Sequence, residues 1–178
     1  MRKLIILLSL PLFALDYVTK EYIVQHFEAP PGAEDARHAT YEHESVPVID
    51  GYFDIVRVHN TGVAFGMANG SAWANVVFGG VTIAALLLIW WLCRNNAFPS
   101  KVSRVAVALL LSGIFGNLID RIFRGYVVDF LHFHYRYEWS WPSFNVADSC
   151  ICIAAVLLFI SAFQKAPAKD VAGHQGLT

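Results

Sequence analysis

The chain has 178 residues, of which 56% are hydrophobic and only 15% are charged, and its formal net charge is −1 with His neutral. A soluble domain of this size must expose much of its surface to water, so this composition excludes an ordinary soluble protein and predicts a lipid environment. The near-neutral charge excludes a generally basic nucleic-acid-binding protein, and no RNA- or DNA-binding motif is present. The length predicts one domain spanning residues 1–178.

Four apolar stretches predict four transmembrane helices, at about residues 4–27, 73–93, 102–119 and 147–163. Each is close to the ~20 residues that cross ~30 Å of hydrocarbon. Arg2 and Lys3 followed by Leu4–Leu15 also resemble the start of a cleavable signal peptide. The apolar character resumes beyond Asp16 and no small-x-small cleavage site follows, so we predict a retained helix.

The placement of basic residues predicts the topology. They mark the chain ends and the short segment between the second and third spans: Arg2, Lys3, Arg94, Lys101, Arg104, Lys165 and Lys169. The positive-inside rule therefore places both termini in the cytoplasm. The two long connections, at about residues 28–72 and 120–146, lie outside.

The outer connections differ in character along their length. Residues 28–45 are polar and contain Pro and Gly, which predicts a flexible insertion. Residues 52–60 alternate in part between apolar and polar side chains, and residues 127–133 have the pattern of a strand or a buried loop. We therefore expect a small β-sheet on the outer face of the membrane.

The first and third spans carry polar groups that are costly in lipid. Asp16 and Lys20 are four residues apart, with the acid first, as in a favourable helical ion pair. This pair either lets a polar helix insert or braces a neighbouring site. Asn117, Asp120 and Arg121 close the third span, where a salt bridge with a snorkelling arginine is a sufficient explanation.

A functional interpretation of the same third-span group is also open. Asn117 and Asp120 are three residues apart and share a helix face. Together with Asn60, they could present amide and carboxylate groups to an extended peptide.

Two further aspartates are predicted at the same outer depth. Asp129 follows the third span amid aromatic and branched residues, and Asp148 begins the fourth span. Asn145 as an N-cap and Asp148 at the N3 position would explain that second segment by helix capping alone. If the helix ends meet, however, two carboxylates sharing one site keep one proton between them. The ionised partner can then deprotonate a water while the protonated partner polarises a carbonyl, as peptide hydrolysis requires.

Other chemistries have weaker support. No Gly-x-Ser-x-Gly and no His-Glu-x-x-His motif is present. Asp129, His132 and His134 form a D-x-x-H-x-H pattern that could bind a metal, although interfacial histidines often only snorkel. A small proton-coupled carrier or membrane assembly subunit is the alternative function, but no inverted repeat or broken span is visible. We expect neither a metal nor another cofactor.

Five motifs together carry a family resemblance. LDYVTK (15–20), HNTGVAFG (59–66), GNLIDR (116–121), VVDF (127–130) and FNVADS (144–149) resemble lipoprotein signal peptidase, or signal peptidase II, along the whole chain from the first span to the fourth. The resemblance implies a bacterial inner-membrane aspartic peptidase with its active site at the outer face. Its substrates are prolipoproteins, cut before the cysteine that carries a diacylglyceryl group.

The resemblance also implies a fold and a set of site residues. The fold is an all-α membrane protein of four transmembrane helices, with a small periplasmic β-sheet and an interfacial helix near Gly62–Gly70. Membrane lipids surround it, and we expect a monomer. The implied catalytic residues are Asp129 and Asp148, with Asn60, Asn117, Arg121 and Asn145 binding substrate, and Asp16, Lys20 and Asp120 in support. The chain departs from the family pattern at Tyr17, where glutamine is usual, and in its longer 28–45 connection.

Overall fold

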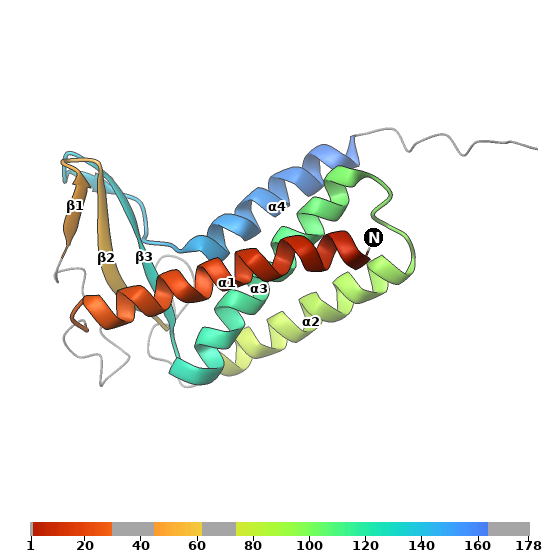
Figure 1. The fold of residues 1–178 in the computed structure, drawn as a ribbon, viewed down its shortest axis with the longest axis horizontal. Coiled ribbons are helices and arrows are strands. Elements are labelled where there is room, and N and C mark those ends of the chain that lie inside the picture. The colour runs from red at the N-terminus through yellow and green to blue at the C-terminus, as the bar shows by residue number, and fades with distance from the viewer. Residues whose placement is uncertain (1, 30–44, 62–73, 164–178) are drawn as a thin grey trace, which may run out of the picture.

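The structure is a computed structural model that describes residues 2–29, 45–61 and 74–163, and it combines a helical bundle with a small sheet (Figure 1). The helices are α1 (Arg2–His26), α2 (Ala74–Arg94), α3 (Lys101–Arg124) and α4 (Val146–Ala162). The strands are β1 (Val46–Ile49), β2 (Phe53–Asn60), β3 (Val127–Tyr135) and β4 (Trp139–Ser140). The sheet lies at one end of the bundle, beside the end of α1 and the start of α4.

The third helix is longer than the sequence pattern predicts. We expected the span to end at about residue 119, but α3 continues to Arg124 and ends where Gly125 takes a left-handed conformation, with φ 78°. The N–H of Gly125 donates to the carbonyl oxygen of Arg121, which closes the last turn. Asp120 and Arg121 therefore lie on the helix and not in the outer connection.

Two of the described helices are long and apolar enough to cross a membrane by length and composition. They are Val76–Arg94 within α2 and Lys101–Arg124, while Val146–Ala162 is a shorter apolar helix. Only about 6% of the apolar stretch of α2 is buried inside the protein, compared with 39% of the apolar stretch of α3. The side chains of α2 are therefore largely directed away from the rest of the bundle.

Two glycines on α3 allow the helices to approach closely. A side chain at Gly113 would collide with the carbonyl oxygen of Ala147 and with Ile151 on α4. A side chain at Gly116 would collide with the Asp16 carboxylate on α1 and with Ala147. Small residues let helix backbones pack closely in lipid, so this face of α3 brings α1 and α4 together.

The strands form one antiparallel sheet in the order β1-β2-β3-β4, which confirms the small sheet that the sequence predicts. The pairing of β2 with β3 runs from Phe53 opposite Phe133 to Asn60 opposite Val127, with a bulge between Ile55 and Val58. The end of α1 packs against this sheet through a buried cluster of Ile23, Val128 and Phe130.

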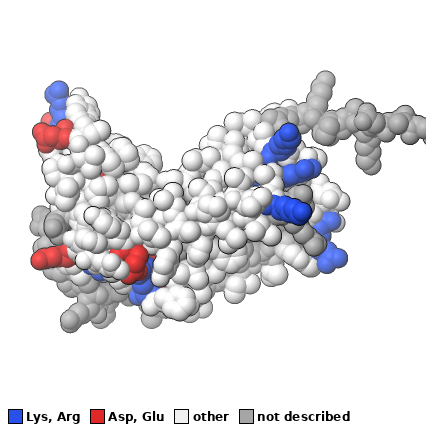
Figure 2. Space-filling model, in the orientation of Figure 1, with Lys and Arg blue, Asp and Glu red and all other residues white. Residues whose placement is uncertain are grey.

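Charged side chains are distributed unevenly over the surface. On the face shown in Figure 2, most Lys and Arg gather at the end of the bundle far from the sheet, whereas Asp and Glu lie at the sheet end together with a few basic side chains. The interfacial helix expected near Gly62–Gly70, and most of the insertion expected at 28–45, lie outside the described residues.

Candidate active site

Asp129 lies on β3, at the end of the sheet that meets the helices. Its side chain is 2% exposed. The Asn145 amide donates to its Oδ1 at 2.7 Å, and the Asn60 amide donates to its Oδ2 at 2.9 Å. Asn60 reaches it because the register sets Asp129 opposite Val58, two residues along β2 on the same face.

Asp148 is positioned by the first turn of α4. The Asn145 side chain accepts a hydrogen bond from the Asp148 N–H at 2.9 Å, and the Asp148 carboxylate accepts one from the Asn145 N–H at 3.2 Å. This reciprocal arrangement is a capping box. Asn145 therefore caps the helix and also holds Asp129. Helix capping and a role in the aspartate site are thus compatible explanations of this segment.

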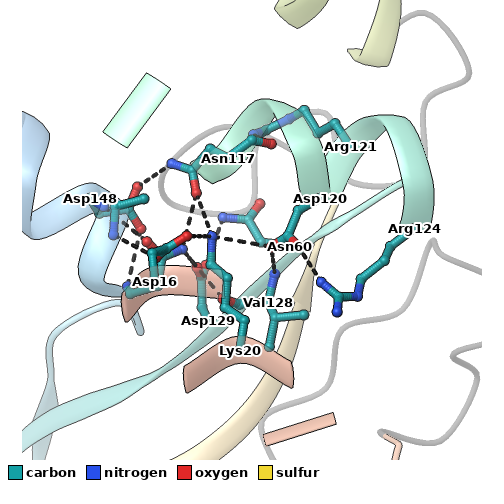
Figure 3. A network of polar contacts seen from close by, with 12 residues as sticks. Asp16, Lys20, Asn60, Asn117, Asp120, Arg121, Arg124, Val128, Asp129 and Asp148 are labelled. Atoms are coloured by element: carbon teal, nitrogen blue, oxygen red, sulfur yellow. Dashed lines mark hydrogen bonds and ion pairs between the residues drawn. The ribbon is translucent and has the colours of Figure 1, made fainter. Parts of the chain in front are cut away.

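Asn117 on α3 connects Asp148 with the first helix. Its amide group donates to Asp148 Oδ1 at 2.8 Å. Its oxygen accepts from Lys20 Nζ at 3.1 Å and from the Asn145 amide at 3.2 Å. Both ends of the Asn117 side chain are thus fixed, and its orientation is determined (Figure 3).

A buried charge cluster supports these groups. Lys20 Nζ lies 2.8 Å from Asp16 Oδ2 and 3.2 Å from Asp120 Oδ2, and all three side chains are 1% exposed. Asp16 also accepts from the Ala147 N–H at 2.7 Å, and Asp120 from the Val128 N–H at 3.1 Å. The cluster therefore ties α1 and α3 to the backbone beside each of Asp148 and Asp129.

The cluster extends to two residues that the sequence interpretation missed. Arg124 pairs with Asp120 on its own helix and with Glu21 on α1. The spacing of Asp120 and Arg124, four residues apart on one helix face, was the available signal. Nothing in the sequence pattern indicated Glu21, which meets Arg124 only through helix packing.

Eight of the nine predicted site residues form one polar network. They are Asp16, Lys20, Asn60, Asn117, Asp120, Asp129, Asn145 and Asp148. Arg121 lies at its edge: a long 3.4 Å hydrogen bond joins its Nη1 to the Asn117 carbonyl oxygen. Its guanidinium carbon lies 4.6 Å from the centre of the Phe78 ring.

The electrostatics of the site favour one retained proton. Burial, joined by the nearby Asp148 carboxylate, raises the pKa of Asp129 to about 7 against the opposing hydrogen bonds from Asn60 and Asn145. Near neutral pH this carboxyl therefore keeps a proton far more readily than an ordinary aspartate, next to the more accessible Asp148.

The histidines of the D-x-x-H-x-H pattern lie away from Asp129. Residues 132 and 134 point to the opposite face of β3, because side chains alternate along a strand. His134 lies 3.2 Å from Asp54, and His132 contacts the Ser143 hydroxyl at 3.0 Å. Among residues 2–29, 45–61 and 74–163, no three His, Cys, Asp or Glu side chains form a group that could hold a metal ion.

Comparison with known proteins gives a consistent result. The family model described as Signal peptidase (SPase) II matches residues 8–164. Proteins named lipoprotein signal peptidase from Syntrophotalea carbinolica and Syntrophus aciditrophicus are 35% and 38% identical to the chain. The alignments cover 89% of this chain and 90% of the first protein, and 88% and 89% for the second.

Solved structures agree with the sequence relatives. One bacterial membrane enzyme superposes with a TM-score of 0.74 at 27% identity, covering 97% of this chain and 95% of the other. A second gives 0.71 at 28% identity, covering 91% and 94%. On the family match and on these relatives, the chain belongs to the signal peptidase II family.

Proposed function

We propose that this protein is an aspartic endopeptidase that removes signal peptides from diacylglyceryl-modified prolipoproteins. Family membership supports the lipoprotein substrate, because the relatives are named lipoprotein signal peptidases. The observation that carries the aspartic mechanism is the double role of Asn145. One side chain donates to Asp129 and caps the helix turn that holds Asp148.

In the proposed mechanism, the two aspartates share one proton and act on a single water. The ionised carboxylate takes a proton from the water, which attacks the carbonyl carbon before the lipidated cysteine. The protonated carboxyl donates its proton to the carbonyl oxygen as negative charge develops there. The carboxyl that took the water proton then gives it to the leaving nitrogen as the C–N bond breaks, and the other carboxylate recovers a proton from a hydroxyl of the intermediate. No metal and no covalent intermediate take part in these steps.

The remaining polar residues position the substrate and the aspartates. Asn60, Asn117 and Asn145 hold the two carboxylates beside the place proposed for an extended peptide, with Arg121 at the margin. Asp16, Lys20 and Asp120 keep the helix ends in register. Correct placement of reacting groups can supply several kcal/mol of the barrier reduction.

The proposed arrangement in the membrane follows from helix length and charge. We infer one domain of four spans, with both termini in the cytoplasm and the aspartates at the outer face, working as a monomer. The basic end of the bundle in Figure 2 fits the inner side under the positive-inside rule. The α1 helix carries more charged residues than α2, but its buried Asp16 and Lys20 neutralise each other.

The test is cleavage of a prolipoprotein peptide by the purified protein in detergent, with and without the diacylglyceryl group. We expect cleavage of the lipidated peptide alone, at the bond before the cysteine. A folded sample that cuts neither peptide would contradict the proposal. Proton flux in liposomes would then support the carrier alternative, since a peptidase produces none.

A further inference from the structure

Arg57 on β2 joins the sheet to the end of α1. Its Nη1 donates to the carbonyl oxygens of Val24 at 3.0 Å and Phe27 at 2.7 Å. Carbonyl oxygens at the end of a helix lack N–H partners within that helix and carry its partial negative charge, so a guanidinium group stabilises this helix end. The planar guanidinium group also carries an Nε–H, which remains for a further partner.

His59, two residues further along β2, is that partner. The Arg57 Nε donates to His59 Nε2 at 3.1 Å. An arginine side chain has only donors, so Nε2 must accept, and the ring is neutral with its proton on Nδ1. Burial, together with the charges of Arg57 and Arg124, lowers the pKa of His59 to about 4, which keeps the ring neutral near pH 7. Within the part of the chain that the structure describes, Nδ1 has no hydrogen-bond partner, so the contact with Arg57 is the polar contact that orients the ring.

His59 lies beside the groups that hold Asp129. In the pairing of β2 with β3 it is opposite Val128, and Asn60 follows it on β2. The Asn60 amide donates to Asp129 Oδ2 at 2.9 Å. Hydrogen bonds weaken steeply when they bend or lengthen, so a small shift at the end of β2 would weaken this one. A contact that fixes this end of β2 therefore also fixes one of the donors to Asp129.

We propose that neutral His59 is a positioning residue of the aspartate site. It holds Arg57 on the end of α1 and thereby keeps the adjacent Asn60 within hydrogen-bond reach of Asp129. Lys20 ties the same helix to α3, so the two contacts together fix the sheet relative to the helices. A protonated ring would place an N–H against the Arg57 Nε–H and break the contact. The effect of His59 on turnover rests on the proposed function.

Ring stacking on Tyr126 is the competing role for His59, because the two rings lie 3.8 Å apart at 18°. Two substitutions separate the roles. His59→Gln keeps an acceptor near the Nε2 position and loses the ring, whereas His59→Phe keeps the ring and loses the acceptor. We expect His59→Gln to keep the wild-type kcat and His59→Phe to lower kcat about tenfold with KM unchanged, because the reacting groups lose alignment. His26→Phe, the same change at an exposed position on α1, should match wild type. The reverse order of the two His59 variants would overturn the positioning role.

A second measurement needs no turnover. An NMR titration of the Asp129 carboxyl carbon reports whether Asn60 still donates to it. The hydrogen bond from Asn60 lowers the pKa of Asp129, so its loss in His59→Phe should raise that pKa above the wild-type value, and His59→Gln should leave it unchanged. The same Asp129 pKa in wild type and both variants would overturn the positioning role, whether or not the protein cuts peptides.

The contact between His59 and Arg57 is tested in wild type alone, where no substitution can disturb folding. NMR of the histidine ring nitrogens reports the tautomer, and we expect a neutral His59 ring with its proton on Nδ1 from about pH 5.5 to about pH 8. A proton on Nε2, or a ring that titrates near its ordinary pKa, would overturn the contact and the positioning role with it. An inactive wild type that shows the expected tautomer and the expected Asp129 shift would remove the proposed function and keep the role of His59.

Discussion

At the scale of single residues, Asn145 links the two aspartates. Its side chain oxygen caps α4, and its amide group donates to Asp129 at 2.7 Å and more weakly to the Val128 carbonyl oxygen at 3.3 Å. Its side chain is fully buried, so these bonds are not exchanged with water. Capping and positioning can be separated by a residue that caps but cannot reach Asp129.

The Asn145→Ser substitution makes that separation. Serine is a good N-cap, so we expect the unfolding temperature to stay close to that of wild type. Its hydroxyl is too short to replace the amide at Asp129, and we expect kcat to fall about 100-fold, the usual effect of losing one positioned donor. Asn145→Ala should lose both properties. Full activity in Asn145→Ser would show that the contact with Asp129 is dispensable.

The raised pKa of Asp129 predicts two pH dependences. Because the proposed reaction needs one proton on the pair, kcat/KM should decline as pH rises through about 7.

The free energy of unfolding should also decline as pH rises. The folded protein holds the proton between the ordinary pKa of 3.8 and about 7 while the unfolded chain has lost it, so the free energy of unfolding falls across that range. Thermal unfolding of wild type and Asp129→Asn measures this, and an equal slope in both would contradict it.

At the scale of elements, the Lys20 cluster joins α1 to α3 by charge. Removing the cation leaves Asp16 and Asp120 buried without their shared partner, a loss of about 3–5 kcal/mol. We therefore expect Lys20→Met to lower the unfolding temperature strongly and to lower activity with it. Lys101→Met, at an exposed position on α3, is the matched control and should behave as wild type. Similar unfolding temperatures for the two variants would show that the cluster adds no stability.

Close helix contact at Gly116 makes a second prediction at this scale. A methyl group there would press on the Asp16 carboxylate and on Ala147, so we expect Gly116→Ala to cost about 1–3 kcal/mol. Gly80 on α2 has open space around its Cα, and Gly80→Ala should leave stability equal or slightly higher. Detergent unfolding curves measure both, and equal stability of the two variants would rule out tight packing at Gly116.

At the scale of the whole molecule, the sequence predicts the positions of the four helices well because each lies in a long and mainly apolar stretch. The end of α3 was missed because Asp120, Arg121 and Arg124 interrupt the apolar pattern, and the stop signal is the conformation of Gly125. β1 could not be predicted either. All four of its residues are exposed, so its sequence does not alternate between apolar residues for a buried face and polar residues for an exposed one. β4 has only two residues and depends on its pairing with β3.

In the candidate site too, some contacts could be predicted from the sequence and others could not. Residues that act within one helix turn, such as Asp16 with Lys20 or Asn145 with Asp148, have spacings that the sequence displays. Contacts between elements, such as Glu21 with Arg124 or Asn60 with Asp129, depend on helix packing and strand register. The approach of Asp129 to Asp148 belongs to this second class. The sequence indicated it only as a possible meeting of helix ends and through the family resemblance.

The most direct test of the account is cleavage of a diacylglyceryl prolipoprotein peptide by three purified variants. They are Asp129→Asn, Asp148→Asn and the exposed control Asp50→Asn. The account predicts that Asp50→Asn cuts at the wild-type rate and that the other two retain no measurable turnover while remaining folded. Near-normal cleavage by either Asp129→Asn or Asp148→Asn would contradict the aspartate pair as the catalytic centre.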